Sequence, residues 1–569
     1  MNAVELTDGY KLDHRRQYPK GTEFVYSNWT PRSNEYFKEA TDGCVVFGIQ
    51  YFIKKYLIEY FNRNFFALDE DVAVESFRRR IDTFLGENNV GTEHIRELHK
   101  LGYLPVKVKA LPEGSICPIR VPMLTIINTD PRFFWVTNYL ETIMSCELWL
   151  PMTSATTARV YRKGLERHAE KTGFDKNVAL GFLCHDFSMR GMAGLEASIT
   201  SGMGHLTSFF GSETIPAINA VEEYYNANAE KELIAATVPA SEHSVMCAGG
   251  FDNEFETFKR FITELYPKGF VSIVSDTWDL WKVVTDYVPR MKDEILARDG
   301  RLVIRPDSGN PVDIICGVTE DVVHIKDEFE TTENAEDFYA ETILNRVRKI
   351  TPHGERGDSV YSMVFEYKGE YTRVTLTNIN WNRYDKQYYY IDMWEKAEFE
   401  YEKLDSTIYK GVYELLWDVF GGNVNEKGYK VLDPHIGVIY GDSITIERQK
   451  EIYKRLEEKG FAATNLVLGI GSFTYQYRTR DSLGFAMKAT WCQINGEPKE
   501  IFKKPKTDSG MKNSLKGLIR VDKDENGVYY ATDCVTKEQE EGGCLEVVFE
   551  NGELKKEVSL KEIRERLCK

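Results

Sequence analysis

The chain has 569 residues, of which 42% are hydrophobic, so it is long enough for two or more domains with a sizeable core. Its formal net charge of −17 argues against a general nucleic-acid or membrane-surface binder, because no excess of Lys and Arg exists to neutralise phosphates over a wide face. No apolar run approaches the roughly 20 residues that span a bilayer, and the N-terminal sequence lacks the apolar stretch of a secretory signal. The ten cysteines form no CxxC pair, which predicts free, buried thiols and a cytoplasmic location.

The first 150 residues mix short predicted strands with an amphipathic helix. We expect strands at residues 23–29 and 104–111 and a helix near residues 48–61. This mixture differs from the segments that follow, and it predicts a β-rich part of the molecule that is separate from an α/β core.

Between residues 181 and 480 short apolar strands alternate with helical segments, a pattern typical of a parallel sheet covered by helices. The predicted strands end at Val274, Ile304, Tyr440 and Leu468. The loops after parallel strands lie at one end of the sheet, where ligands bind in α/β folds. Four such loops carry Asp, Arg, Ser or Gly at their starts, which favours a site over simple helix capping, although capping stays open for any single loop.

Residues 318–407 fit neither pattern, because acidic helix-like sequence is followed there by aromatic-rich strands. We therefore predict an inserted subdomain. After Leu483 the chain alternates apolar and polar residues, with hairpin turns at Asn526-Gly527 and Asn551-Gly552. The expected organisation is a β-rich ancillary domain of residues 1–150 and 483–569, a barrel-like α/β catalytic domain of residues 151–482, and the insert.

The segment HDFSMRGM, His185 to Met192, carries side chains suited to a phosphorylated heteroaromatic ligand. Phe187 offers a flat apolar face and Arg190 a cation with several donors. Gly191 and Gly194 permit close approach of the backbone to a ligand. A strand end with a buried Asp-Arg pair remains an equal alternative for this segment alone.

Three further loops carry groups that bind sugars and phosphates. Arg305 and Asp307 stand two apart on an extended strand end, so they point the same way, the cation toward phosphate and the carboxylate toward ribose hydroxyls or Mg²⁺. Asp442 suits sugar hydroxyls. Gly471 and Ser472 lead toward a helix and could present backbone N–H groups to a phosphate, although a tight turn explains the same residues.

His243, in VPASEHSVM, could be a packed core residue, a metal ligand or a group that does chemistry. No Cys or His stands at metal-ligand spacing near it. Downstream lies the densest basic interval of an acidic chain, which is either a solvated strand surface or a pocket for several phosphates. Its members are Arg480, Lys488, Lys503, Lys504 and Lys512.

Taken in order, these segments resemble the nicotinamide phosphoribosyltransferases, which are type II phosphoribosyltransferases. The resemblance covers nearly the whole chain except the insert, with the family's order and approximate spacing. The matching segments are TDGYKLDHRRQYP (7–19), VYSNWTPR (25–32), WVTNYLET (135–142), HDFSMRG (185–191), FGSET (210–214), TVPASEHS (237–244), VSDTWD (274–279), IRPDSGNP (304–311), GDS (441–443), LGIGS (468–472) and TRD (479–481).

The resemblance implies transfer of the phosphoribosyl group from phosphoribosyl pyrophosphate to nicotinamide, giving nicotinamide mononucleotide and pyrophosphate in NAD biosynthesis. It implies Mg²⁺, ATP as co-substrate, and a homodimer with active sites at the interface. The implied fold is an irregular α/β barrel with a β-rich α+β domain built from both chain ends. Growing charge on the pyrophosphate leaving group would be stabilised by Arg, Lys and Mg²⁺.

The resemblance also implies residue roles. The base would stack between Phe187 and the partner subunit's Tyr10, while Arg190, Arg305 and Asp307 meet carboxamide, ribose and pyrophosphate. ATP would phosphorylate His243, with Asp279 orienting its ring, and Mg²⁺ would lie near Asp307 and Asp279. The other substrate-binding positions are Asp8 (from the partner subunit), Glu213, Thr237, Ser275, Gly441, Asp442, Gly471 and Ser472. The phosphate-binding cations, from the other subunit, are Arg32, Arg480, Lys488, Lys503 and Lys512.

The chain departs from the family pattern at several positions. Glu213 stands where nicotinamide-preferring members carry Asp; a carboxylate there accepts from the carboxamide N–H₂ and repels nicotinate. Ile470, Ser472 and Phe473 replace mostly Ser and Gly, Ala486 replaces a Ser, and the insert is foreign to the family. Two alternatives stay open: a nicotinate phosphoribosyltransferase, and a non-catalytic nucleotide-binding dimer.

Overall fold

The computed structural model describes residues 1–174, 180–319, 322–325, 329, 332–347, 361–377, 379–382, 387–390, 397–441, 443–503 and 514–568. The chain divides into two compact units. Unit 1 comprises Met1–Val238, Gly441–Gln449 and Val467–Lys569, and unit 2 comprises Pro239–Tyr440 and Lys450–Leu466.

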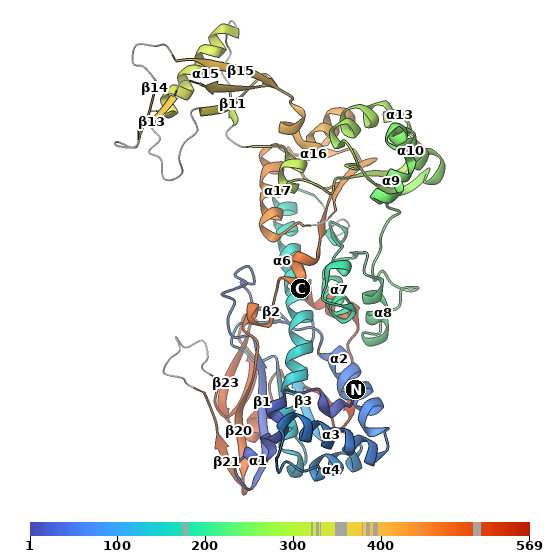
Figure 1. The fold of residues 1–569 in the computed structure, drawn as a ribbon, viewed down its shortest axis with the longest axis vertical. Helices are drawn as coiled ribbons and strands as arrows, with labels where there is room; N and C mark the ends of the chain where they lie inside the picture. Colours follow the sequence, from blue (N-terminus) through green and yellow to red (C-terminus); the bar gives the residue numbers. More distant parts are fainter. Residues whose placement is uncertain are drawn as a thin grey trace. The chain divides into compact units, whose positions relative to one another are not determined.

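A seven-stranded antiparallel sheet in unit 1 combines strands from both ends of the chain (Figure 1). Strand β1 lies between β20 and β5, so residues 472 positions apart pair directly, as in Thr22 with Ile494. In sheet order the strands are β21 (Glu497–Glu500), β20 (Ala486–Ile494), β1 (Thr22–Thr30), β5 (Leu124–Asn128), β3 (Val106–Ala110), β24 (Glu546–Glu550) and β25 (Glu553–Leu554). Both expected strands of the N-terminal region lie in this sheet.

The two predicted hairpin turns are present. Asn526-Gly527 joins β22 (Leu518–Lys523) to β23 (Tyr529–Val535), and Asn551-Gly552 joins β24 to β25. Asn551 and both glycines have positive φ, which is the conformation that tight hairpin turns require.

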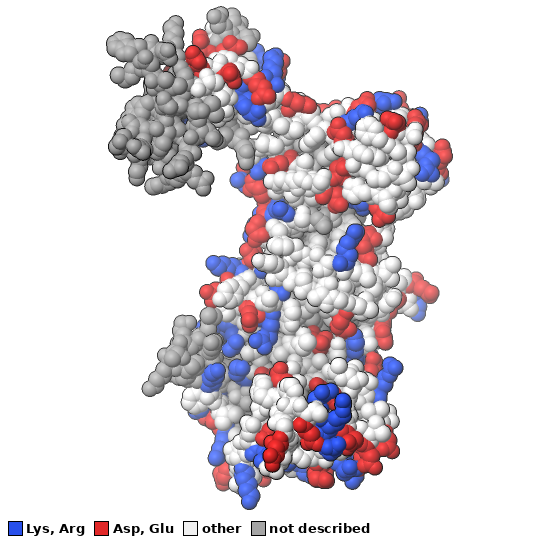
Figure 2. Space-filling model, viewed as in Figure 1, with Lys and Arg blue, Asp and Glu red and all other residues white. Residues whose placement is uncertain are grey.

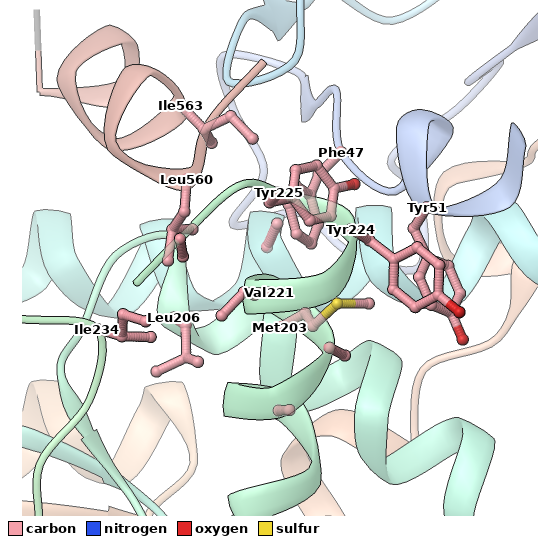
Figure 3. Packing of buried hydrophobic residues seen from close by; sticks show 14 of the residues in the cluster. Phe47, Tyr51, Met203, Leu206, Val221, Tyr224, Tyr225, Ile234, Leu560 and Ile563 are labelled. Atoms are coloured by element: carbon pink, nitrogen blue, oxygen red, sulfur yellow. The ribbon is translucent and has the colours of Figure 1, made fainter. Parts of the chain in front are cut away.

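Helices α7, α2 and α18 of unit 1 contact α6 (Glu141–Thr172), the long helix drawn in cyan in Figure 1. Apolar residues from several of them share one core cluster (Figure 3), in which Leu560 and Ile563 of the C-terminal helix pack with Phe47, Val221 and Tyr225. The other helices of this unit include α2 (Ile49–Phe52), which continues as the π-helical segment Ile53–Tyr60, and α3 (Glu70–Leu85), α4 (Glu93–Leu101), α7 (Leu195–Leu206), α8 (Ile215–Tyr224), α18 (Ser472–Gln476) and α20 (Leu560–Leu567).

Parallel strands are present in each unit, as the alternating apolar pattern predicts. In unit 1, β6 (Cys184–Asp186) pairs with β7 (Gly211–Ser212) and with β19 (Leu466–Ile470). In unit 2, β9 (Asp299–Arg305) pairs with β8 (Lys268–Val274) and with β18 (Ile436–Tyr440). Pro311 opens α14 (Pro311–Cys316) as predicted, with Asn310 as its N-cap.

The insert has a hydrophobic core of its own. Four of its described strands form a sheet in the order β10-β11-β12-β15, and the cluster of Tyr339, Ile343, Phe365 and Val374 joins this sheet to α15. The bounds are β10 (Val322–His324), α15 (Thr332–Val347), β11 (Tyr361–Tyr367), β12 (Glu370–Leu376) and β15 (Phe399–Leu404), with the hairpin β13 (Ile379–Asn382) and β14 (Gln387–Tyr390).

All ten cysteines are free, but the prediction that they are buried is wrong for part of the set. Five are buried, whereas Cys146, Cys247, Cys534 and Cys568 are exposed and Cys544 is intermediate. Within the described ranges, no helix is both long and apolar enough to cross a membrane.

Candidate active site

The first group of predicted residues lies at the carboxyl end of β6, in unit 1. Phe187 follows the strand directly, and its backbone N–H donates to Ile470 O of β19 at 2.9 Å. The preceding Asp186 is fully buried and accepts from Ser188 N at 2.9 Å and Thr214 Oγ1 at 2.7 Å. These bonds fix the loops on both sides of Phe187, whereas Arg190 is exposed.

Glu213 stands beside this strand end and is held by its neighbours. Its backbone N–H donates to Asp186 O at 3.0 Å, and its Oε1 lies 2.9 Å from His185 Nε2. The Thr237 hydroxyl donates to the same carboxylate oxygen. The His185 ring also lies 4.7 Å from the ring of Phe187, centroid to centroid. The predicted residues Phe187, Glu213 and Thr237 therefore meet around His185, which the sequence alone did not single out.

Gly471 and Ser472 lie at the start of α18, directly after β19. A Cβ on Gly191 would lie 2.0 Å from Ser472 Oγ, so only glycine lets the HDFSMRG loop approach this turn so closely. Two separate motifs of the sequence, HDFSMRG and LGIGS, thus come together in unit 1. The next residue, Phe473, is exposed and stacks on Tyr477 at 4.7 Å.

In unit 2, Arg305 and Ser275 stand at the carboxyl ends of β9 and β8. Ser275 N donates to Arg305 O at 2.9 Å, and Arg305 Nη2 donates to Ser241 O at 2.6 Å. Ser241 Oγ in turn accepts from Val274 N at 2.9 Å. The guanidinium of Arg305 is therefore tied to the segment that leads into His243.

His243 is the N-terminal residue of α9 (His243–Gly249), and its side chain is 47% exposed. Its Nδ1 lies 3.2 Å from Thr277 Oγ1, and its Nε2 lies 3.8 Å from Asp307 Oδ2. This exposure removes the interpretation of His243 as a packed core residue. The ring can be reached from solvent and faces a carboxylate.

Asp276 joins the two loops of this site. Its Oδ2 accepts from Asp307 N at 2.9 Å and from Ser308 Oγ at 2.6 Å. Its Oδ1 is buried and has no hydrogen-bond partner among the residues that the structure describes. Asp279, expected beside His243, caps α11 (Leu280–Lys282) by accepting from Lys282 N at 3.1 Å, so Thr277 is the residue at Nδ1.

The described basic residues of the predicted phosphate pocket cluster in unit 1. Burial lowers the pKa of Lys488, Glu141 raises it, and Arg32, Lys503 and Arg480 lower it further. Cations that lie up to 471 positions apart in sequence thus come near Lys488. Lys488 lies on β20, which pairs with β1 through Asn28. The chain as a whole is acidic, and Figure 2 shows Lys and Arg interspersed with Asp and Glu over the described residues of the visible face.

Asp8 and Tyr10 lie near the start of α6, where Asp8 contacts Thr142 and Glu141 acts on Tyr10. Thr142 Oγ1 donates to Asp8 Oδ2 at 2.7 Å, and Tyr10 is 66% exposed. Burial, Glu141 and Asp8, in that order, raise the pKa of Tyr10. The Tyr10 ring contacts His14 of its own chain, at 5.0 Å between ring centroids, and most of its surface remains exposed.

The remaining predicted positions are less informative. Gly441 is buried and follows β18 directly, whereas Asp442 and Lys512 lie outside the described residues. The residues that the sequence did not assign to the site are His185, Asp276 and Thr277. They lie within the matched motifs, but no spacing rule distinguishes them from their neighbours.

Known proteins resemble this chain along its whole length. The nicotinate phosphoribosyltransferase family matches residues 182–349 and 397–553, which leaves out residues 350–396 of the insert. The N-terminal domain of nicotinamide phosphoribosyltransferase matches residues 2–108.

Two relatives carry the same name. A nicotinamide phosphoribosyltransferase of Acinetobacter baylyi is 44% identical over 100% of this chain and 97% of its own length. The one of Mycoplasma pneumoniae is 31% identical over 88% of this chain and 92% of its own length.

A crystal structure of nicotinate-nucleotide pyrophosphorylase from Pyrococcus furiosus has a TM-score of 0.51 at 15% identity and covers 100% of this chain and 94% of its own. This likeness shows the fold, which is the irregular α/β barrel class of the type II phosphoribosyltransferases with a β-rich part. With the full-length relatives, it establishes that the chain is an enzyme that belongs to the nicotinamide phosphoribosyltransferase branch of the nicotinate phosphoribosyltransferase family.

Proposed function

We propose that the protein transfers the phosphoribosyl group from phosphoribosyl pyrophosphate to nicotinamide, forming nicotinamide mononucleotide and pyrophosphate. The observation that carries the proposal is that the Phe187 ring and the Glu213 carboxylate both contact His185 at one strand end. A ring face stacks the base, and a carboxylate accepts from the carboxamide N–H₂ while repelling the carboxylate of nicotinate.

The charged residues support the chemistry of the sugar. Displacement of pyrophosphate at ribose C1 passes through an oxocarbenium-like state in which negative charge grows on the leaving group. Arg305 and the cations around Lys488 would stabilise that charge, and stacking on Phe187 would hold the ring nitrogen in position for attack. No protein nucleophile is required at the sugar.

The carboxylates at the ends of β8 and β9 fit a magnesium ion. Mg²⁺ prefers oxygen ligands and commonly takes one or two carboxylates together with substrate phosphates. Asp307 and Asp276, whose Oδ1 is buried and without a partner among the described residues, would hold it. The ion would neutralise charge on the pyrophosphate; a position near Asp279 stays a prediction.

We further propose that ATP phosphorylates His243. An exposed imidazole with room around it is a competent phosphoryl acceptor in its neutral form. Thr277 at Nδ1 and Asp307 near Nε2 would select the tautomer. Hydrolysis of the phosphohistidine would then drive mononucleotide synthesis forward.

We also propose a homodimer in which one subunit supplies Asp8, Tyr10 and the cation cluster to the base site of the other. The exposure of the Tyr10 ring, which is 66%, supports this arrangement. Phe187 and Tyr10 would then enclose the base from two sides.

The decisive experiment compares the two bases. Purified protein is incubated with phosphoribosyl pyrophosphate, Mg²⁺ and either nicotinamide or nicotinate, and the mononucleotides are separated by chromatography. We expect kcat/KM to favour nicotinamide by at least ~100-fold, about 3 kcal/mol of discrimination. A preference for nicotinate would overturn the assignment of the substrate. That result would implicate Glu213, whose side chain is one methylene longer than that of Asp.

A further inference from the structure

His185 is a buried histidine that the proposed chemistry does not use, yet it touches both parts of the base site. Its ring lies 4.7 Å from that of Phe187, and its Nε2 lies 2.9 Å from Glu213 Oε1. Only 8% of His185 is exposed, whereas the side chain of Glu213 is 41% exposed. The buried imidazole therefore lies between the stacking ring and the carboxylate that faces solvent.

The ring of His185 has little freedom to move. A Cβ placed on Gly211 would lie 2.7 Å from His185 Nδ1, so the ring packs directly on the backbone of β7. A carboxylate is only an acceptor, so Nε2 carries the proton of this hydrogen bond. The neighbouring His205 is neutral near pH 7, because burial lowers its pKa to about 4.

Glu213 is thus held by three hydrogen bonds within unit 1. Asp186 O accepts from its backbone N–H, and both His185 Nε2 and the Thr237 hydroxyl donate to Oε1. The side chain of Glu has one more rotatable bond than that of Asp. Glu213 therefore needs these hydrogen bonds to present its carboxylate to the carboxamide in a single geometry.

We propose that His185 is a positioning residue for base selectivity. It holds the Glu213 carboxylate where the carboxamide of a base stacked on Phe187 can donate to it. This inference rests on the proposed function, because it concerns how the same site distinguishes an amide from a carboxylate. It does not involve the reacting atoms of the sugar.

The test compares His185→Leu, which removes the donor, with His185→Gln, whose Nε2 can donate from a similar position. Loss of a hydrogen bond to a charged group corresponds to a change of about tenfold. We expect His185→Leu to raise KM for nicotinamide by ~10-fold while kcat stays within ~2-fold of the unmodified protein. The same variant should show a smaller preference for nicotinamide over nicotinate. His185→Gln should restore both the KM and this preference.

Two further variants complete the design. Thr237→Val removes the second donor and should raise KM for nicotinamide by ~3-fold, so the inference stays testable if His185→Leu does not fold. His324→Leu is the matched control, because His324 Nδ1 pairs with Glu366 at 3.0 Å in the insert and should leave both constants unchanged.

An unchanged KM and base preference in both His185→Leu and Thr237→Val would overturn the inference. A loss confined to kcat, or a His185→Gln protein that behaves like His185→Leu, would also overturn it. If the unmodified protein forms mononucleotide from neither base, the proposed function fails instead.

Discussion

His243 illustrates how little a residue type reveals without its surroundings. Its nine-residue context allows a packed, a metal-binding or a reactive histidine. In the structure the ring is half exposed, and Thr277 and Asp307 lie beside its two nitrogens. Within the described residues, no cluster of three His, Cys, Asp or Glu side chains could hold a metal ion. The surroundings therefore favour the phosphoryl acceptor.

We expect His243→Ala to lose ATP hydrolysis but to keep measurable mononucleotide synthesis, because the acceptor is removed while Phe187, Glu213 and Arg305 remain. Phosphate release from ATP and mononucleotide formation are measured in parallel. Thr277→Val is the matched control, since it keeps the imidazole and should slow hydrolysis by only ~10-fold. Undiminished hydrolysis by His243→Ala would refute the phosphohistidine.

At the scale of elements, the insert behaves as a separate folding unit attached at two adjacent points. Val318 N donates to Ile408 O at 2.9 Å, so the two ends of the insert lie side by side. Its buried cluster of Tyr339, Ile343, Phe365 and Val374 belongs to the insert itself. Stacking of Tyr371 on Tyr409, at 4.5 Å, is a contact with α16 (Thr407–Phe420).

We therefore expect that residues 322–404 can be replaced by a short Gly-Ser linker without loss of catalysis. The two ends of the insert are adjacent, so closing a short linker between them costs little entropy. The buried core of the insert is also made of its own residues. The transferase activity should stay within ~3-fold of the full chain. As a control, Val374→Asp places a charge in the insert core and should unfold the insert alone. Loss of activity in both variants would show that the insert supports the active site.

At the scale of the molecule, the proposed dimer divides one active site between two chains. Arg305 and Phe187 would come from one subunit, and Tyr10 and Lys488 from the other. An acidic chain with a local cluster of cations is suited to this arrangement, because the cluster can bind phosphates without a wide basic surface.

Subunit mixing tests the division. Lys488→Ala and Arg305→Ala are each expected to be nearly inactive, but an equal mixture of the refolded chains should regain about a quarter of the normal activity. Half of the dimers are mixed, and one of the two sites in each mixed dimer carries neither change. A mixture whose activity equals only the sum of the activities of the two variants would exclude shared sites. Sedimentation would report the oligomeric state directly.

The sequence by itself determined the elements and the kinds of chemistry. The apolar runs ending at Val274 and Ile304 are the strands β8 and β9, and Pro311 opens a helix, because these features depend on local periodicity and backbone geometry. Side chains two apart, such as Arg305 and Asp307, were assigned to one strand end by the same local reasoning. Motifs in family order indicated the enzyme class.

Only the tertiary structure decided which distant residues meet. The contacts of His185 with Glu213 and Phe187 depend on the pairing of β6 with β7. The pairing of Asn28 with Lys488 depends on β1 lying beside β20. The hydrogen bond from Asp307 N to Asp276, which joins two loops, likewise follows from the pairing of β8 with β9. Periodicity specifies which face a residue occupies, whereas partners across strands are fixed by the packing of the whole chain.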